Sequence, residues 1–153
     1  MQPLARSLAC ALIVLSIARA QACATARVVS FGKATRWADG WASFLLSDRP
    51  ISFFPARGVN LVAINASTEE VIFARSYKKA PDQLKKDLQD VALDTVVLVA
   101  LKGGADQESL QALSLVHASL FPVLAEGEGY AFIAGRGGVP ITEDLGRVAD
   151  ATS

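Results

Sequence analysis

Short runs of branched and apolar residues, separated by turn-forming residues, recur through the first half of the chain and predict β-strands. Residues 59–64 (VNLVAI) and 71–77 (VIFARSY) form the clearest pair, because the turn-rich stretch 65–70 (NASTEE) joins them. This pattern predicts an antiparallel hairpin. Shorter runs at 28–31 and 42–46 predict two further strands nearer the N-terminus.

The second half of the chain alternates between helix and strand patterns. After Pro81, apolar residues recur at intervals of four and three, which predicts an amphipathic helix. An uninterrupted apolar run at 95–101 (TVVLVAL) predicts a central strand that is covered on both faces. Asp106 is a candidate cap for a second helix that continues to about Ser119. The last predicted strand is 130–134 (YAFIA).

The first twenty residues have the pattern of a cleavable secretory signal. Arg6 supplies a positive charge, residues 8–18 (LACALIVLSIA) are apolar, and Ala18-Arg19-Ala20 places small residues where signal peptidase cleaves. A second site of this kind, Ala22-Cys23-Ala24, follows. The apolar run is shorter than the roughly twenty residues that a bilayer span needs. We therefore expect release outside the cell or into the secretory-pathway lumen, with no membrane span after cleavage.

Composition places the chain among ordinary globular domains, since hydrophobic residues make up 52% and charged residues 20% of its 153 positions. The formal net charge is +0, which argues against a nucleic-acid partner, because such binding proteins carry a concentrated basic face. The two cysteines, Cys10 and Cys23, lie in or next to the leader, so we expect no disulfide within the mature domain.

Motifs of catalytic chemistry are scarce. His117 is the single histidine, and there is no second histidine or suitable cysteine with which it could hold zinc. No serine lies in a Gly-x-Ser-x-Gly turn. The run Gly103-Gly104-Ala105-Asp106 lacks the Gly-Lys-Ser/Thr of a phosphate-binding loop, and we interpret it as a turn from strand to helix. We therefore expect a protein that is not an enzyme and that uses neither a cofactor nor a metal.

The predicted hairpin turn contains one modification motif. Asn65-Ala66-Ser67 is a sequon for N-linked glycosylation, and a turn between two strands leaves an acceptor asparagine accessible. In a eukaryotic secretory pathway we expect Asn65 to be a glycosylation site.

Residues 57–65 (RGVNLVAIN), followed by 70–75 (EVIFAR), are similar to the Gly-Arg-Gly-Φ-Asn strand, the turn and the second strand of the interleukin-like EMT inducer (ILEI)/PANDER domain family. The resemblance spans about residues 28–138. The similarity continues through a short helix at 82–88 and closes at 130–137 (YAFIAGRG), which resembles the family's aromatic-Φ-Φ-Gly-x-Lys-Gly ending.

The resemblance implies a compact, single α+β domain of two antiparallel β-sheets with two to three flanking helices. Together with the residue patterns, this divides the chain into a signal peptide at 1–20, an ILEI/PANDER-like domain at 27–138 and, from its polar sequence, a flexible C-terminal tail at 139–153. It also implies a secreted binding module whose partner is a glycan (carbohydrate), or else a cytokine-like signal with an extracellular protein partner. The alternatives are a hydrolase-type secreted enzyme and a structural extracellular interaction protein.

The chain departs from the family at several positions. It has no cysteines in the domain, and Ala56 stands where the first glycine of Gly-Arg-Gly would be. Lys78 and the pair Gly103-Gly104 stand where the family has acidic residues. These differences fall in predicted surface loops, so they bear on function more than on fold.

Four residues are candidates for ligand contact. Arg57 precedes one predicted strand and Arg136 follows another, and each is flanked by glycine. If these strands are antiparallel neighbours, both guanidinium groups emerge at one sheet edge and can hold a carboxylate or sulfate group through paired hydrogen bonds. Otherwise the arginines are solvated or pair with local acids. Trp37 and Trp41 are either core anchors or, if exposed, part of a groove for a sugar.

Overall fold

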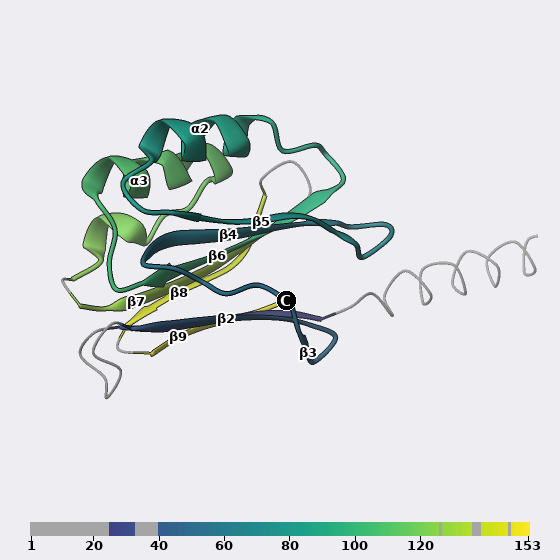
Figure 1. Ribbon diagram of the computed structural model, residues 1–153, viewed down its shortest axis with the longest axis horizontal. Coiled ribbons are helices and arrows are strands. Elements are labelled where there is room, and N and C mark those ends of the chain that lie inside the picture. The colour runs from purple at the N-terminus through teal and green to yellow at the C-terminus, as the bar shows by residue number, and fades with distance from the viewer. Residues whose placement is uncertain (1–24, 33–39, 126, 136–138, 147) are drawn as a thin grey trace, which may run out of the picture.

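The computed structural model describes residues 25–32, 40–125, 127–135, 139–146 and 148–153. Its strands are β1 Ala26–Phe31, β2 Trp41–Leu46, β3 Arg49–Pro50, β4 Gly58–Asn65, β5 Val71–Tyr77, β6 Thr95–Lys102, β7 Gly129–Ala134, β8 Pro140–Gly146 and β9 Val148–Thr152. They form a four-stranded sheet of order β3-β2-β1-β9 and a five-stranded sheet of order β5-β4-β6-β7-β8. The two sheets are stacked, and helices cover the outer face of the larger one (Figure 1).

The five-stranded sheet is the centre of the molecule because both of its faces are covered. One face packs against the smaller sheet through residues such as Val62 and Leu98, which are fully buried. The other face packs under the helices through residues such as Leu61 and Val99. Successive side chains along a strand point to opposite faces, so β4, β6 and β7 supply two cores at once. This explains their uninterrupted apolar runs and confirms the predicted central strand and hairpin.

The helices are short. They are α2 Pro81–Gln89, α3 Gln107–Ala112 and the 3₁₀ turns η1 Leu113–Val116 and η2 Phe121–Val123. Leu84 and Leu88 form the buried stripe of α2, as predicted. The second helix does not continue to Ser119, because its last turn tightens into η1 and His117 then takes a left-handed conformation with φ 60°.

The expected α+β class is therefore wrong. The described residues form nine strands in two antiparallel sheets and only two short α-helices, so the protein is compact but mostly β. Two observations overturn the expectation. The second helix is shorter than its apolar stripe indicated, and the segment after residue 138 is built of strands.

The expectation of a flexible tail at 139–153 is also wrong. β8 pairs with β7 at one edge of the larger sheet, and β9 pairs with β1 at one edge of the smaller sheet. Ala149 and Ala151 are fully buried in the core between the sheets. The Asp150 carboxylate accepts hydrogen bonds from the Arg27 guanidinium, so a polar sequence is compatible with an ordered edge strand here.

The two sheets are joined by a buried hydroxyl. Ser30 of β1 donates a hydrogen bond of 2.5 Å to the Leu101 carbonyl oxygen and accepts one of 3.1 Å from the Tyr130 backbone N–H.

No described helix is long and apolar enough to cross a membrane. The expected signal peptide lies outside the described residues.

Candidate functional site

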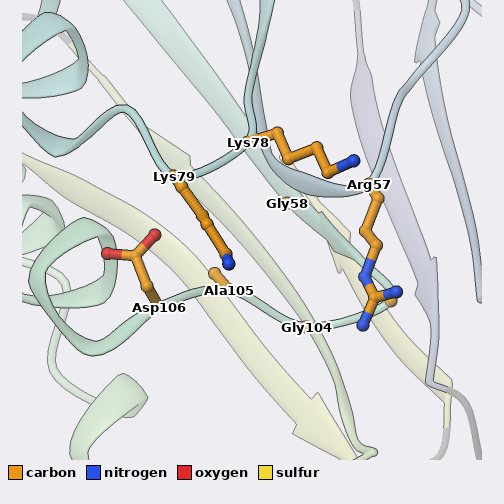
Figure 2. A pocket seen from close by; sticks show the side chains of 8 residues that line it. Arg57, Gly58, Lys78, Lys79, Gly104, Ala105 and Asp106 are labelled. Atoms are coloured by element: carbon orange, nitrogen blue, oxygen red, sulfur yellow. The ribbon is translucent and has the colours of Figure 1, made fainter.

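A pocket of about 570 Å³ opens at one end of the five-stranded sheet, where β4 begins and β5 and β6 end (Figure 2). Three segments that are far apart in the sequence form its walls: the residues before β4, the turn after β5 and the loop between β6 and α3. The lining residues are Arg57, Gly58, Lys78, Lys79, Gly103, Gly104, Ala105 and Asp106.

Strand register brings these segments together. Val59 at the start of β4 pairs with Tyr77 at the end of β5, and Gly58 pairs with Lys102 at the end of β6. Residues just before β4 therefore meet residues that follow β5 and β6, because both neighbours run antiparallel to β4. This places Arg57 beside the loops that carry the other lining residues.

Asn60 fixes the backbone that carries Arg57. Its side chain is fully buried, and Oδ1 accepts hydrogen bonds from the Ala56 N–H (3.0 Å) and the Ser76 hydroxyl (2.5 Å). Nδ2 donates to the carbonyl oxygens of Ala56 (2.9 Å) and Gly58 (3.1 Å). Because the residues on both sides of Arg57 are tied to one amide, the arginine side chain leaves the sheet from a fixed base.

Two glycines shape the pocket in different ways. Gly58 has φ +114°, and a Cβ added there would lie 2.2 Å from the Tyr77 carbonyl oxygen, so only glycine fits. Gly104 has φ +88°, but an added Cβ would meet nothing within 4 Å. The backbone at Gly104 is therefore exposed to the pocket, where a ligand can approach the main chain.

The pocket carries an excess of positive charge. In Figure 2 the Arg57 guanidinium lies beside Gly104, Lys79 points toward Ala105, and Lys78 reaches toward Arg57. Within the described ranges, no ion pair joins these three cations to a carboxylate. Such a group of cations is suited to hold the oxygens of a carboxylate, sulfate or phosphate group.

The one carboxylate of the pocket is already engaged. Asp106 caps α3, accepting hydrogen bonds from the Ser109 N–H (2.9 Å) and the Ser109 hydroxyl (2.7 Å). Burial acts to raise the pKa of Asp106, but these hydrogen bonds outweigh it and hold the pKa below its usual value. Asp106 is therefore a charged structural group that offsets one of the three positive charges lining the pocket, so an excess of positive charge remains.

A second polar cluster, centred on Asp87 of α2, has a different character. Its carboxylate accepts hydrogen bonds from Arg75 Nη1 (2.9 Å to each oxygen), from the Tyr77 hydroxyl (2.5 Å) and from Gln83 Nε2 (2.8 Å). Burial and the hydrogen bond to Asp87 raise the pKa of Tyr77. The cluster ties α2 to β5, so we assign it a structural role.

Only part of the predicted arginine pair can be placed. Arg57 lines the pocket, whereas Arg136 lies outside the described residues. The premise of a shared site is not met, because β6 separates β4 from β7 and pairs antiparallel with both. β4 and β7 consequently run parallel, and Gly58 and Ala134 lie at opposite ends of β6.

The other predicted residues have varied settings. Trp37 lies outside the described residues. Trp41 begins β2 and is 39% exposed, with its ring edge-on to Phe31 at 5.3 Å between centroids. Asn65 ends β4 in the hairpin turn, as predicted. His117 is exposed, and the described residues contain no group of three or more potential metal ligands.

The lysines that lie near Arg57 were not predicted as its partners from the sequence. Two adjacent lysines, Lys78 and Lys79, directly follow the second hairpin strand, and this was the available signal. Pairing that strand with 59–64 in register would have placed both lysines beside Arg57.

The family model described as interleukin-like EMT inducer matches residues 57–138, a segment that contains β4 to β7 and the helices between them. None of the curated proteins compared with the chain matches it. Since the matched segment makes up more than half of the chain and includes every residue that lines the pocket, the chain belongs to the interleukin-like EMT inducer family.

Proposed function

We propose that this protein is a secreted, non-catalytic binding module that holds the acidic group of an extracellular glycan in the pocket of Arg57, Lys78 and Lys79. One observation carries the proposal: three cations surround a glycine-lined pocket and have no carboxylate partner among the described residues. Membership of the interleukin-like EMT inducer family supports an extracellular, cytokine-like role.

The chemistry of the three side chains favours an oxyanion. A guanidinium group presents a planar fork of donors that matches a carboxylate or sulfate group, and each ammonium group adds a mobile positive charge. The open backbone at Gly104 adds room for close approach of a ligand. Within this pocket the remaining ionisable group, Asp106, is used in capping α3, so we propose binding without chemical conversion of the ligand.

A glycan array with the secreted protein tests the proposal. We expect oligosaccharides that carry sulfate or carboxylate groups to be retained, and neutral ones to be lost on washing. Arg57→Ala, Lys78→Ala and Lys79→Ala should each weaken the interaction by roughly ten- to a hundredfold, the scale of a hydrogen bond to a charged group. Arg57→Lys should restore only part of the affinity, because an ammonium group lacks the planar fork.

Lys86→Ala is the matched control, because Lys86 is an exposed lysine on α2 outside the pocket. This variant should bind the same oligosaccharides with unchanged affinity. Equal retention of acidic and neutral sugars, or equal weakening by Lys86→Ala, would contradict the proposal.

A cytokine-like role through a protein partner is a second candidate, and the edge strand β5 favours it. β5 is one of the two edge strands of the larger sheet, and Val71 and Ile72 are 43% and 53% exposed. A strand edge with exposed apolar side chains can accept a further strand from a partner. Cross-linking on responsive cells, with Ile72→Lys compared with the native protein, distinguishes this candidate from glycan binding.

A further inference from the structure

A second hollow lies at the opposite end of the sandwich from the cationic pocket. It has a volume of about 280 Å³ and opens between the two sheets, near the pair Ile64–Val96 rather than the pair Gly58–Lys102. Its walls include the aliphatic side chains of Leu46, Ile64, Val96 and Ile141. Ile141 is 50% exposed there, so apolar surface is left in contact with water.

Asn65 lies at the rim of this hollow and begins the sequon Asn65-Ala66-Ser67. Its side chain is ordered by the turn: Oδ1 accepts the backbone N–H groups of Ser67 (2.8 Å) and Thr68 (2.9 Å). Nδ2 donates a hydrogen bond of 3.1 Å to an Asp94 carboxylate oxygen. A glycosylated asparagine keeps its carbonyl oxygen and one N–H, so it can make this same set of bonds.

We propose that Asn65 carries an N-linked glycan whose first N-acetylglucosamine covers the hollow between the sheets. The donor is a lipid-linked oligosaccharide pyrophosphate. A bond forms between Asn65 Nδ2 and C1 of the sugar, the bond from C1 to the lipid pyrophosphate breaks, and the amide releases one proton. The lipid pyrophosphate leaves with the bonding electrons.

The dimensions and chemistry of the hollow fit one sugar residue. At about 280 Å³ it is smaller than the 300–1,000 Å³ typical of sites for larger ligands. A pyranose ring has an apolar face, and the N-acetyl group adds a methyl, so both can cover Ile141 and Val96. The polar edge of the ring meets water and the rim at Asn65 and Ser153, which also line the hollow.

The experiment separates the first sugar from the rest of the glycan. The full chain is expressed in a eukaryotic secretory cell line that keeps its N-glycans in the high-mannose form, once as it stands and once behind a heterologous secretory signal. We expect an electrophoretic shift that peptide N-glycosidase removes and that is absent from both Asn65→Gln and Ser67→Ala.

The secreted protein is then trimmed in two ways. An endoglycosidase that leaves one N-acetylglucosamine on Asn65 should change neither the melting temperature nor the fluorescence of an apolar dye. Peptide N-glycosidase, which removes this sugar and leaves aspartate, should lower the melting temperature by about 2–4 °C and increase dye fluorescence. The unglycosylated variant Ser67→Ala keeps Asn65 and its bonds in the turn, and it should show the same lower melting temperature and higher dye fluorescence, which separates loss of the sugar from the new charge.

Two results would overturn the inference. A chain secreted behind the heterologous signal without any glycan at Asn65 would exclude the modification. A glycosylated chain whose melting temperature and dye binding do not change after peptide N-glycosidase would show that the sugar does not cover the hollow.

Discussion

The Tyr130 hydroxyl donates a hydrogen bond of 2.6 Å to the Glu143 carboxylate, which joins β7 to β8 across their shared face. The same carboxylate accepts the backbone N–H groups of Ser119 (2.9 Å) and Leu120 (2.7 Å) and the Ser119 hydroxyl (2.8 Å). Burial acts to raise the pKa of Glu143, but these bonds outweigh it and hold the pKa below its usual value. Burial and this carboxylate together raise the pKa of Tyr130.

Glu143→Gln should destabilise the protein. The neutral amide weakens the bonds from Tyr130 and Leu120 and turns an N–H toward donors, so we expect a loss of about 1.5–3 kcal/mol in the free energy of unfolding. Urea denaturation followed by tyrosine and tryptophan fluorescence measures the change. Glu108→Gln is the control, since Glu108 is exposed in the first turn of α3. Equal midpoints for the two variants would show that Glu143 does not anchor β8.

Acid should lower the stability of the fold by protonating Asp87 and weakening the hydrogen bonds that its carboxylate accepts. Burial alone acts to raise the pKa of Asp87, but hydrogen bonds from Tyr77, Arg75 and Gln83 lower it from the ordinary value of 3.8. A carboxylate whose pKa is lower in the folded state contributes stability that is fully present above its unfolded pKa and lost as the pH falls through the folded value. We therefore expect the free energy of unfolding to fall on acidification below about pH 4.

Asp87→Asn should flatten this acid dependence as well as lower stability at neutral pH. The measurement is a series of urea midpoints from pH 7 down to pH 2. Asp90→Asn is the matched control, because Asp90 is exposed at the C-terminal end of α2. If the slope of Asp87→Asn equalled that of the native chain, the acid dependence would come from other carboxylates.

The parts of the fold that the sequence predicted depend on local patterns. The hairpin of β4 and β5 was correct because branched runs flank a turn, and α2 was correct because Leu84 and Leu88 repeat at helical spacing. β8 and β9 were missed because contacts distant in sequence order them. Asp150, for example, pairs with Arg27, 123 positions away, and a polar residue with such a partner cannot be distinguished from a residue of a flexible tail.

The residues of the candidate site, too, were predicted only where the signal in the sequence is local. Arg57 was singled out from its neighbouring glycine, which is a local feature. Its pocket partners, Lys78 and Lys79, depend on the register that pairs Val59 with Tyr77. The expected partner Arg136 was inferred from an assumed antiparallel pairing, whereas β6 lies between the two strands concerned.

Substitutions at Gly58 and Gly104 should have different effects: the first should mainly lower the stability of the fold, and the second should mainly hinder the approach of a ligand to the pocket. Gly58→Ala places a Cβ 2.2 Å from the Tyr77 carbonyl oxygen at positive φ, so we expect a loss of about 3 kcal/mol or more in the free energy of unfolding. Gly104→Ala meets no atom within 4 Å and should cost only about 1–2 kcal/mol of backbone strain. Its added methyl should nonetheless weaken binding of an acidic oligosaccharide, measured by calorimetry. Similar stability losses for both variants would contradict the described packing.

The side-chain amide of Asn60 should increase the affinity for the ligand by holding Arg57 in position. Asn60→Ala frees the Ala56 N–H and the carbonyl oxygens of Ala56 and Gly58, so we expect a stability loss of about 1–3 kcal/mol and weaker binding of acidic oligosaccharides. Arg57→Ala should weaken binding without this stability loss, because the Arg57 side chain is exposed. In the double variant, binding should be no weaker than in Arg57→Ala alone, since Asn60 then has no guanidinium to position. Calorimetric titration of all four proteins, at a temperature at which circular dichroism shows each to be folded, completes the cycle. Additive losses would mean that Asn60 shapes the pocket independently of Arg57.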